Sequence, residues 1–541
     1  MGFFEFLYRW RLQQKGHASG RKRLQERDTP LLDWFEEGRT SRWLICLAFL
    51  GIVSGMLLAP GPGGFGWTYE GIQRVLMTLV IFAASLVYFY VGHPEEIERN
   101  GRIALAYGVI LMQLFFVKGL ELLVNALEGG QGLLFILVPA AFAPMLLRVL
   151  LGRRFGMFAV TVASLLTALL VKTDLRFEFV VSSLIGGAVA IYVMRRARHR
   201  RRLVQAGIYV GVTNLILALA LGQITFAGQP LDQTLYQILA ALLVGLVTAT
   251  LVGGLLPIFE GLFQLTTDMS WIEMADLNHP LLRRLTIEAP GTYHHSLVVA
   301  QLAEAAAEKI GANPIECRVC SYFHDIGKLQ KPLYFIENQG DGVNPHDELT
   351  PTMSSLIIIA HVKEGVDLAI RNKLNPQIMD AIREHHGDSL VGYFYQRARK
   401  QQEEAHAKAE KGEISEDDVP RIEESNFRYP GPRPKSKETA IISLADAVES
   451  ASRSLGKPSP SRIRQLIDDI FQGRIADGQL DDAPLTMAEL KLLKESFSSN
   501  LRSMLHHRVP YPKEPGEAKS TEPKAGAVTQ RATKETSRSA A

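Results

Sequence analysis

Eight apolar segments between residues 43 and 260 constrain this 541-residue chain more than any other feature. A helix needs roughly 20 mostly apolar residues to cross about 30 Å of hydrocarbon. The segments that meet this requirement are Trp43–Leu58, Val75–Val91, Ile103–Val124, Leu133–Leu151, Phe155–Val171, Phe179–Met194, Leu203–Phe226 and Leu235–Phe259. We therefore predict a polytopic helical membrane bundle with eight spans. This pattern excludes a wholly soluble enzyme and a disordered scaffold.

The charges of the loops predict how the bundle is oriented. Lys and Arg accumulate in the cytoplasmic loops of membrane proteins. Residues 1–42 are rich in both, and so is the segment Arg195–Arg202, which an eight-span topology puts on the same side. The loop after Val171 is predicted to lie outside, although it holds Lys172 and Arg176. We expect the N-terminus and everything after the last span to be cytoplasmic.

One pair of opposite charges falls inside a predicted span. Lys118 and Glu121 lie one turn apart in the third span, near its predicted outer end. An ionisable residue inside a membrane marks a functional site by default. The position of this pair favours snorkelling or a simple ion pair over such a site. The scarcity of charge in the other spans argues against an ion-coupled transporter.

After Phe259 the sequence changes to the pattern of soluble helices. Three predicted helices begin with a capping residue followed by proline, a combination typical of helix starts. These starts are Asn313-Pro314, Thr350-Pro351 and Asn375-Pro376, and the glycines able to end two of the helices are Gly327 and Gly387. No stretch alternates with the period of a strand over any length. The predicted fold class of the whole chain is therefore all-α.

These patterns divide the chain into five parts. They are a basic N-terminal segment (1–42), the membrane bundle with its N-terminal anchor (43–260), a connecting helix (261–290) that breaks near His279, an all-α domain (291–512) and a disordered tail (513–541). A charged insertion at 396–424 has no assigned role. The three cysteines are too few for a disulfide-stapled secreted protein. A net charge of +3 gives no reason to expect a nucleic-acid partner.

Histidines and carboxylates on consecutive helices of the all-α domain form the main chemical signal. The candidates are His294-His295, His324-Asp325, His361, His385-His386 and Asp446. Each adjacent pair places two donor groups within a few ångströms, as a metal cluster requires. A His-rich set with two carboxylates suits iron, manganese or zinc better than magnesium or calcium. With no cysteine in the set, a structural zinc site is disfavoured.

The order of these residues resembles a known signature. His295, His324-Asp325 and Asp446 resemble the H…HD…D signature of the HD phosphohydrolase superfamily. Four segments look more specifically like the seven-transmembrane HD receptors, the PgpH-type cyclic di-AMP phosphodiesterases; these segments are Glu288–Ser296, His324–Lys328, Asn344–Asp347 and Phe427–Pro432. The resemblance covers about Trp43 to Pro512. It implies a signalling enzyme of the bacterial inner membrane with an N-terminal anchor, a seven-helix bundle and a cytoplasmic HD domain.

The resemblance also implies a centre of two divalent transition metals, iron or manganese. The first metal would be held by His295, His324, Asp325 and Asp446, and the second by Asp325, His361, His385 and His386. Asp325 would bridge the metals and act as a catalytic residue. His295 is preferred to His294 because it directly precedes Ser296, as in the family motif. A hydroxide shared by the metals would hydrolyse a cyclic dinucleotide, most simply cyclic di-AMP to pApA.

Lys328 and His346 are the candidate substrate contacts. Lys328 is placed to act catalytically by neutralising a phosphate oxygen, and the alternative is a helix C-terminal cation. His346 lies in a predicted loop, where a substrate contact and a plain turn residue both remain open. Cys317 and Cys320 share a helical face with His324, but small buried residues are favoured over a CxxC metal site.

Two features depart from the family or support a rival. Many members carry a large sensor domain after the first span, whereas residues 59–73 form only a short connection here. Gly392-Tyr393-Phe394 mimics the signature of a cyclic di-GMP hydrolase, although Gly387 and Phe394 replace residues of that pattern. A non-catalytic nucleotide-binding receptor is the alternative from another class, and the complete ligand set argues against it. The sequence leaves homo-oligomer formation and the signal sensed by the bundle open.

Overall fold

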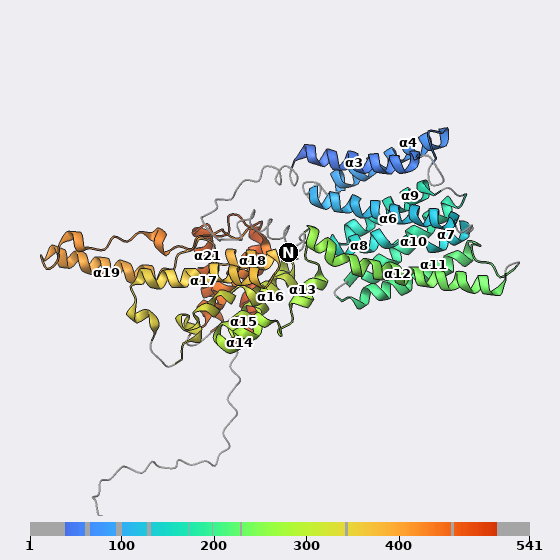
Figure 1. Cartoon of the computed structure of the whole chain (residues 1–541). Coiled ribbons are helices and arrows are strands. Elements are labelled where there is room, and N and C mark those ends of the chain that lie inside the picture. Colours follow the sequence, from blue (N-terminus) through green and yellow to red (C-terminus); the bar gives the residue numbers. More distant parts are fainter. Residues whose placement is uncertain are drawn as a thin grey trace, which may run out of the picture.

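The computed structural model describes residues 38–59, 65–92, 100–126, 131–171, 174–196, 199–227, 230–263, 265–340, 344–455 and 459–505. Throughout these ranges the chain is helical apart from turns and one isolated β-bridge between Leu390 and Arg428. Figure 1 shows a bundle of long helices beside a rounder helical domain. The predicted all-α class is confirmed. The predicted disordered tail, most of the basic segment 1–42 and Lys172 lie outside the described residues.

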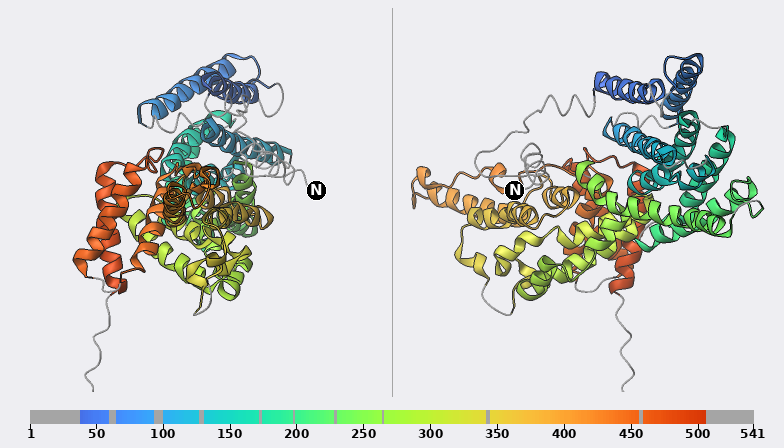
Figure 2. Two further views of the ribbon diagram at one scale, coloured as in Figure 1. Left: turned by 90° about the vertical axis from the view of Figure 1, so that its left-hand side faces the viewer. Right: turned by 45° about the vertical axis from the view of Figure 1, so that its right-hand side comes forward.

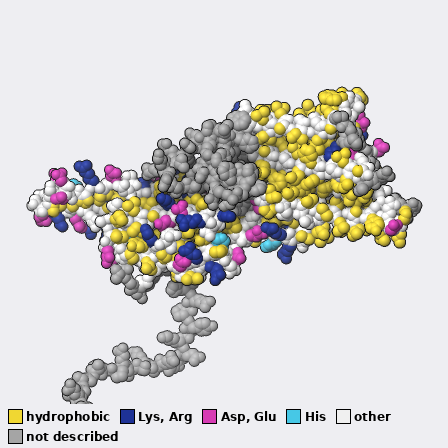
Figure 3. Space-filling view, viewed as in Figure 1, with side chains coloured by type: hydrophobic (Ala, Val, Ile, Leu, Met, Phe, Trp, Pro, Cys, Tyr) yellow, Lys and Arg dark blue, Asp and Glu magenta, His cyan; other side chains and the backbone are white. Residues whose placement is uncertain are grey.

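Nine helices of the described chain build the membrane bundle. They are α3 (Arg39–Leu58), α4 (Tyr69–Gly92), α6 (Asn100–Ala126), α7 (Gln131–Leu137), α8 (Phe142–Leu150), α9 (Arg153–Leu170), α10 (Arg176–Val193), α11 (Arg201–Ala220) and α12 (Leu231–Phe263). Within the described residues they form eight segments long and apolar enough to cross a membrane, because α7 and α8 together make the fourth. Apolar side chains dominate the visible face of this bundle, whereas charged side chains gather over the other domain (Figure 3). The eight predicted spans are confirmed.

The fourth span differs from the continuous helix that we predicted. It is interrupted between Leu137 and Phe142, where Pro139 has no amide proton to donate. Neighbouring helices compensate for the interruption. Asn214 of α11 donates to the carbonyl of Ile136 at 3.0 Å, and Gln113 of α6 accepts from the amide of Ala143 at 2.9 Å. Irregular backbone is tolerated at membrane depth when protein groups satisfy it in this way.

Helices α11 and α12 pack in direct backbone contact. A Cβ on Gly211 would lie 2.3 Å from the carbonyl oxygen of Leu242, and one on Gly245 would lie 2.1 Å from that of Gly207. Only glycine allows this approach, which is the usual way for membrane helices to pack closely. The contact holds α12 firmly against the bundle.

The predicted connecting helix is two short helices in the structure, and the expected break near His279 lies between them. Helix α12 continues to Phe263, and α13 (Asp268–Met274) and α14 (Pro280–Glu288) follow it. The side chains of Thr267 and His279 cap these helices by accepting from backbone amides. Each cap satisfies an amide at a helix start, and the path turns at both places.

The second domain is a cluster of helices around α20 (Lys437–Ser452), whose residues Ala440–Ala445 are fully buried. Its other helices are α15 (Pro290–Ile310), α16 (Pro314–Phe323), α17 (Pro351–Arg371), α18 (Pro376–Glu384), α19 (Gly392–Glu410), α21 (Pro460–Ala476) and α22 (Met487–Leu505). Short 3₁₀ turns join them, including η2 (Ile326–Gln330), η3 (Pro332–Tyr334), η4 (Ile336–Asn338), η5 (Pro345–Glu348), η6 (Glu416–Asp418) and η7 (Glu424–Phe427). Helix α19 opens the charged excursion and reaches away from the bundle (Figures 1 and 2).

The predicted helix starts hold, with one difference in the capping. The side chains of Asn313 and Thr350 accept from backbone amides as expected. Asn375 makes no such cap, and the nitrogen of its side-chain amide donates to the hydroxyl of Thr266 at 2.9 Å. Asn375 therefore connects the start of α18 with the segment that follows α12.

The predicted role of Gly327 is wrong. Helix α16 ends at Phe323, so Gly327 lies beyond it in η2. A Cβ on Gly327 would lie 1.8 Å from the carbonyl oxygen of His361, so this glycine lets η2 pack against the backbone of α17. Gly387 does follow the end of α18 with a positive φ of 57°, as its predicted role requires.

Candidate metal centre

Five helices bring the seven predicted ligands into one buried cluster. His295 comes from α15, His324 and Asp325 from the end of α16, His361 from the middle of α17, His385 and His386 from the end of α18, and Asp446 from α20. Six of them are buried, and the side chain of His386 is 19% exposed. The neighbouring His294 is exposed and takes no part in the cluster.

The two oxygens of Asp325 face two different groups of histidines. Oδ1 lies 3.4 Å from Nε2 of His361 and 3.7 Å from Nε2 of His385. Oδ2 lies 3.3 Å from Nε2 of His324 and 3.6 Å from Nε2 of His295. His386 belongs with His361 and His385. In each group the donor atoms, including an oxygen of Asp325, lie within 4.8 Å of one another. Asp325 thus stands between two sets of donors.

Asp446 lies on the same side as His295. Its Oδ1 is 3.1 Å from Nε2 of His295, and its Oδ2 is 3.7 Å from Nδ1 of His386. The carboxylate of Asp446 therefore lies beside a histidine of each group. This position agrees with the expected ligand set, in which Asp446 joins His295 and His324.

Backbone carbonyls fix the orientation of three imidazoles. Nδ1 of His324 lies 2.7 Å from the carbonyl of Ser321, that of His361 lies 2.6 Å from Ile358, and that of His385 lies 2.9 Å from Ile382. A carbonyl only accepts, so each Nδ1 carries the proton and each Nε2 is left with a lone pair. All three lone pairs belong to atoms that face Asp325. This arrangement is typical of histidines that bind a metal.

Glu449 orients the fourth imidazole, and sequence analysis missed it. Its carboxylate contacts Nδ1 of His295 and also accepts from Arg453 at 2.7 Å. Glu449 lies three residues after Asp446 on α20, which places both carboxylates on one face of that helix. This spacing was the signal available in the sequence, but the contact with His295 requires the fold.

Burial and charge set the protonation of the cluster. Burial lowers the pKa of His361 and of His386, and it lowers the pKa of His385 to about 3, so these rings are neutral at pH 7. Burial raises the pKa of Asp325, but Lys328 and the surrounding histidines lower it more, and the net pKa lies well below its usual value. Burial lowers the pKa of His295, but Asp446 and Glu449 raise it more, to about 9. The charged carboxylate of Asp325 beside the three neutral imidazoles is the form that binds a cation.

The donor atoms fit a metal centre. Nε2 of His295, Nε2 of His324 and Oδ1 of Asp325 are buried and have no hydrogen-bond partner. Buried polar atoms nearly always have a partner, so three such atoms in one cluster indicate a missing ligand. Imidazole nitrogens with carboxylate oxygens are the donors that divalent transition metals prefer. We conclude that the residues present fit divalent transition metals.

Lys328 bonds two carboxylates of the cluster. Its Nζ lies 2.7 Å from Oδ2 of Asp325 and 2.8 Å from Oε1 of Glu337. Glu337 also accepts from the hydroxyl of Thr292 at 3.0 Å, which fixes its position at the start of α15. Because α16 ends before Lys328, the alternative of a cation at the end of that helix does not apply.

His346 lies apart from the donor atoms. Its Nε2 lies 2.8 Å from the carbonyl of Tyr334, and its ring packs against Phe394 with 4.9 Å between centroids. None of its described contacts reaches a metal-ligand candidate. Cys317 and Cys320 are also buried away from the donor atoms, and burial raises the pKa of both thiols well above the usual value.

Tyr429 covers the more exposed side of the cluster. Its ring stacks on His386 with 4.3 Å between centroids and approaches His361 at 6.1 Å. This contact gives a structural role to the segment Phe427–Pro432, which the sequence singled out without a function.

Comparison with known families matches both halves of the chain. A family described as "7TM receptor with intracellular HD hydrolase" matches residues 69–267, and the HD domain family matches residues 292–451. The eight apolar segments and the first of these matches identify a multi-pass membrane protein.

Curated relatives extend this likeness. The cyclic-di-AMP phosphodiesterase PgpH of Listeria monocytogenes is 36% identical over 438 residues, which cover 80% of this chain and 58% of that protein. PgpH of Bacillus subtilis is 33% identical over 448 residues, which cover 82% of this chain and 60% of that protein. The chain thus spans about three fifths of the length of these relatives.

Two solved structures are also similar. They are crystal structures of the HD domain of the L. monocytogenes phosphodiesterase PgpH, one of them in complex with cyclic-di-AMP. Each is 41% identical and covers 42% of this chain, with a TM-score of 0.38. This chain covers 100% of the first and 98% of the second.

Proposed function

We propose that this chain, which belongs to the family of seven-transmembrane receptors with an intracellular HD hydrolase domain, is a membrane-bound phosphodiesterase of cyclic dinucleotides. The preferred substrate is cyclic di-AMP, and the product is linear pApA. The names of the two curated relatives support this activity, and so does the cyclic-di-AMP complex of a 41% identical HD domain.

The observation that carries the proposal is the position of Asp325 between two groups of buried imidazole nitrogens. We assign two divalent transition metals, iron or manganese, to this centre. The first is held by His295, His324, Asp325 and Asp446, and the second by Asp325, His361, His385 and His386. Bound there, the cations would acidify a water molecule and attract the phosphate oxygens.

The chain's own groups prepare the site for a phosphodiester. Lys328 adds a positive charge 2.7 Å from Asp325, at the edge where a phosphate oxygen would approach. Glu337 and Thr292 hold that charge in place. Tyr429 offers an aromatic face for one base beside His386. We keep His346, whose ring packs against Phe394, as a proposed substrate contact.

We further propose that the HD domain lies in the cytoplasm and that the membrane is the bacterial inner membrane. The Lys- and Arg-rich residues 1–42 and the basic segment Arg195–Arg202 support this orientation. A reporter fused near residue 300 tests it, since activity of a reporter that works only outside the cell would contradict it.

The activity is tested with the purified full chain, supplied with manganese and with either cyclic di-AMP or cyclic di-GMP. We expect release of pApA, loss of that product after chelation and its return when manganese is added back. Tight binding of cyclic di-AMP by the metal-loaded protein without any product would indicate a non-catalytic receptor. Faster hydrolysis of cyclic di-GMP would contradict the proposed substrate.

A further inference from the structure

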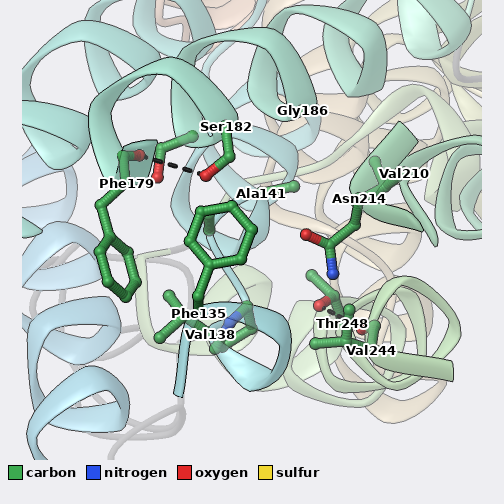
Figure 4. A pocket seen from close by; sticks show the side chains of 13 residues that line it. Phe135, Val138, Ala141, Phe179, Ser182, Gly186, Val210, Asn214, Val244 and Thr248 are labelled. Carbon is green, nitrogen blue, oxygen red and sulfur yellow. Dashed lines mark hydrogen bonds between the residues drawn. The ribbon is translucent and has the colours of Figure 1, made fainter. Parts of the chain in front are cut away.

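A small cavity lies inside the membrane bundle, where the fourth span is interrupted (Figure 4). The interruption and four helices, α7, α10, α11 and α12, contribute to its wall. The residues that matter below are Val138 and Ala141 of the interruption, Ser183 and Gly186 of α10, Asn214 of α11 and Thr248 of α12. The cavity thus lies where irregular backbone meets four helices of the bundle.

The free space is small. The volume open to the centre of a water molecule is about 20 Å³. By this measure one water needs roughly 10–15 Å³, so the cavity takes one or two water-sized groups. A Cβ added to Gly186 would meet no atom within 4 Å, so the space extends to the backbone of α10.

One polar side chain in the wall has no partner. The hydroxyl oxygen of Ser183 is buried and makes no hydrogen bond, and the residue is only 1% exposed. The other polar groups are already engaged, because Asn214 donates to Ile136 and Thr248 donates to the carbonyl of Val244 at 2.7 Å. A buried hydroxyl without a partner loses free energy unless a bound group satisfies it.

The residues of the wall also indicate whether an occupant is charged or neutral. None of the residues that line the cavity carries a formal charge. Ser183 is the eighth of the 18 residues of α10, so the cavity lies near the middle of that span. A charged group at this depth is expensive to bury. The geometry therefore points to an uncharged occupant.

We propose that this cavity is a binding site for an uncharged molecule no larger than about two water molecules, such as a small alcohol, that hydrogen-bonds the hydroxyl of Ser183. The occupant contacts the interrupted backbone on one side and α12 on the other. It is distinct from the metal centre and from the proposed cyclic dinucleotide.

The position of Thr248 connects this site with the metal centre. Helix α12 carries Thr248 and ends at Phe263, shortly before Thr266. The hydroxyl of Thr266 accepts from Asn375 at 2.9 Å and donates to Gln377 at 3.0 Å, at the start of α18. Helix α18 ends beside His385 and His386. An occupant that contacts Thr248 therefore lies on the helix that leads to this junction with α18, and this part of the inference rests on the proposed function.

The test labels a thiol placed in the cavity. Ser183→Cys in the purified full chain is treated with methyl methanethiosulfonate, which is small and uncharged, and separately with its trimethylammonium-ethyl analogue. Ser164→Cys is the matched control, because Ser164 is buried in α9, bonds to the carbonyl of Val160 and does not line the cavity. Mass spectrometry follows both reactions, with the wild type as the baseline for the three buried native cysteines.

We expect the thiol of Ser183→Cys to react with the uncharged reagent at least about tenfold faster than that of Ser164→Cys, because access controls thiol reactivity. Adding Gly186→Ala fills the free space and should slow the reaction. Adding Gly108→Ala, at an exposed position equally free of neighbours, should not. Thr248→Cys serves as a second reporter if Ser183→Cys does not fold.

Two results would overturn the site: equal rates for the cavity thiols and the control, or equally fast reaction with the charged reagent. Hydrolysis of cyclic di-AMP is then compared before and after labelling. A change of about twofold or more supports the link through α12, and unchanged hydrolysis overturns that link. Absence of hydrolysis before labelling contradicts the proposed function and leaves the labelling result intact.

Discussion

Each half of the molecule buries a lysine and a carboxylate three residues apart, and the two pairs have different surroundings. In the membrane bundle, Nζ of Lys118 lies 2.6 Å from Oε2 of Glu121. In the HD domain, Nζ of Lys328 lies 2.7 Å from Oδ2 of Asp325. The spacing and the distances are almost the same. The neighbouring atoms therefore decide what each pair can do.

The membrane pair joins two helices. Lys118 also donates to the carbonyl of Leu170 at 2.9 Å, at the end of α9, where a cation is favoured by the helix dipole. Lys118 is 8% exposed and Glu121 is 1% exposed, so the pair is an internal ion pair and does not snorkel to the interface. Its geometry ties α6 to α9.

The pair in the HD domain is only part of a larger donor set. Asp325 faces imidazole nitrogens of both histidine groups, and several of the buried donor atoms have no hydrogen-bond partner. A satisfied buried pair stabilises contacts, whereas unsatisfied donors around a pair indicate a ligand. The spacing in the sequence thus indicates a charge pair, whereas the atoms that surround the pair in the fold indicate whether it stabilises the protein or belongs to a binding site.

The largest expected effect is that of Asp325→Asn, which removes the negative charge that we propose both metals share. We expect hydrolysis of cyclic di-AMP to fall by more than about 100-fold, beyond the range known for groups that only support metal ligands. The melting temperature and helix content should stay close to those of the wild type. Product release by chromatography measures the loss, with the exposed Asp469→Asn as the control. Near-normal activity would contradict the bridging position.

Glu121→Gln tests the other pair. The substitution leaves the buried charge of Lys118 without its carboxylate, so we expect a loss of about 3–5 kcal/mol of stability. Thermal unfolding in detergent measures this loss. Glu288→Gln, which breaks an exposed pair with Arg284, should cost no more than about 1 kcal/mol. If Glu121→Gln instead abolished hydrolysis per folded molecule, the contrast between the pairs would fail.

Glu449→Ala tests the pair in the HD domain further, because Glu449 contacts the candidate ligand His295 and is not itself a proposed ligand. We expect the affinity for manganese to fall by about 10–100-fold, as for other outer-shell carboxylates. Calorimetric titration of the metal-free protein measures the affinity directly. Glu304→Ala is the matched control, because Glu304 also pairs with an arginine, Arg318, but lies outside the cluster. Equal affinities for the two variants would disprove an orienting role.

The smallest effect is expected for His294→Ala. This side chain is exposed beside the buried His295, so its removal should change stability by no more than about 0.5 kcal/mol. Manganese affinity and hydrolysis should also stay within about twofold of the wild type, as expected for a residue that touches neither the metals nor the substrate. A large loss of metal affinity would transfer the ligand role from His295 to its neighbour.

The sequence predicted the spans and the donor residues because both leave local patterns. Apolar length identifies a span, and adjacent His-Asp and His-His pairs identify donors. The interruption at Pro139 could not be predicted from proline alone, since α12 contains Pro257 and continues through it. The outcome at each proline depends on whether neighbouring side chains, such as Asn214, satisfy the freed backbone groups.

Contacts between distant residues account for the other differences. Glu449 touches His295 across 154 positions of the chain, and Asn375 reaches Thr266 instead of capping its own helix. Each side chain had a partner close in the sequence, since Glu449 also pairs with Arg453 and Asn375 stands where it could cap α18. Tertiary packing selected the distant partner, and no pattern within a single helix records that choice.

Gly327 has a consequence for how this centre can vary. Gly327 lies between Asp325 and Lys328 in the chain, and its backbone packs directly against the backbone of α17 at His361. Even the methyl group of an alanine at this position would push the two segments apart and increase the distance between Asp325 and His361. The geometry of the candidate ligands thus depends on a residue that cannot itself bind a metal, and substitutions of Gly327 should disturb that geometry.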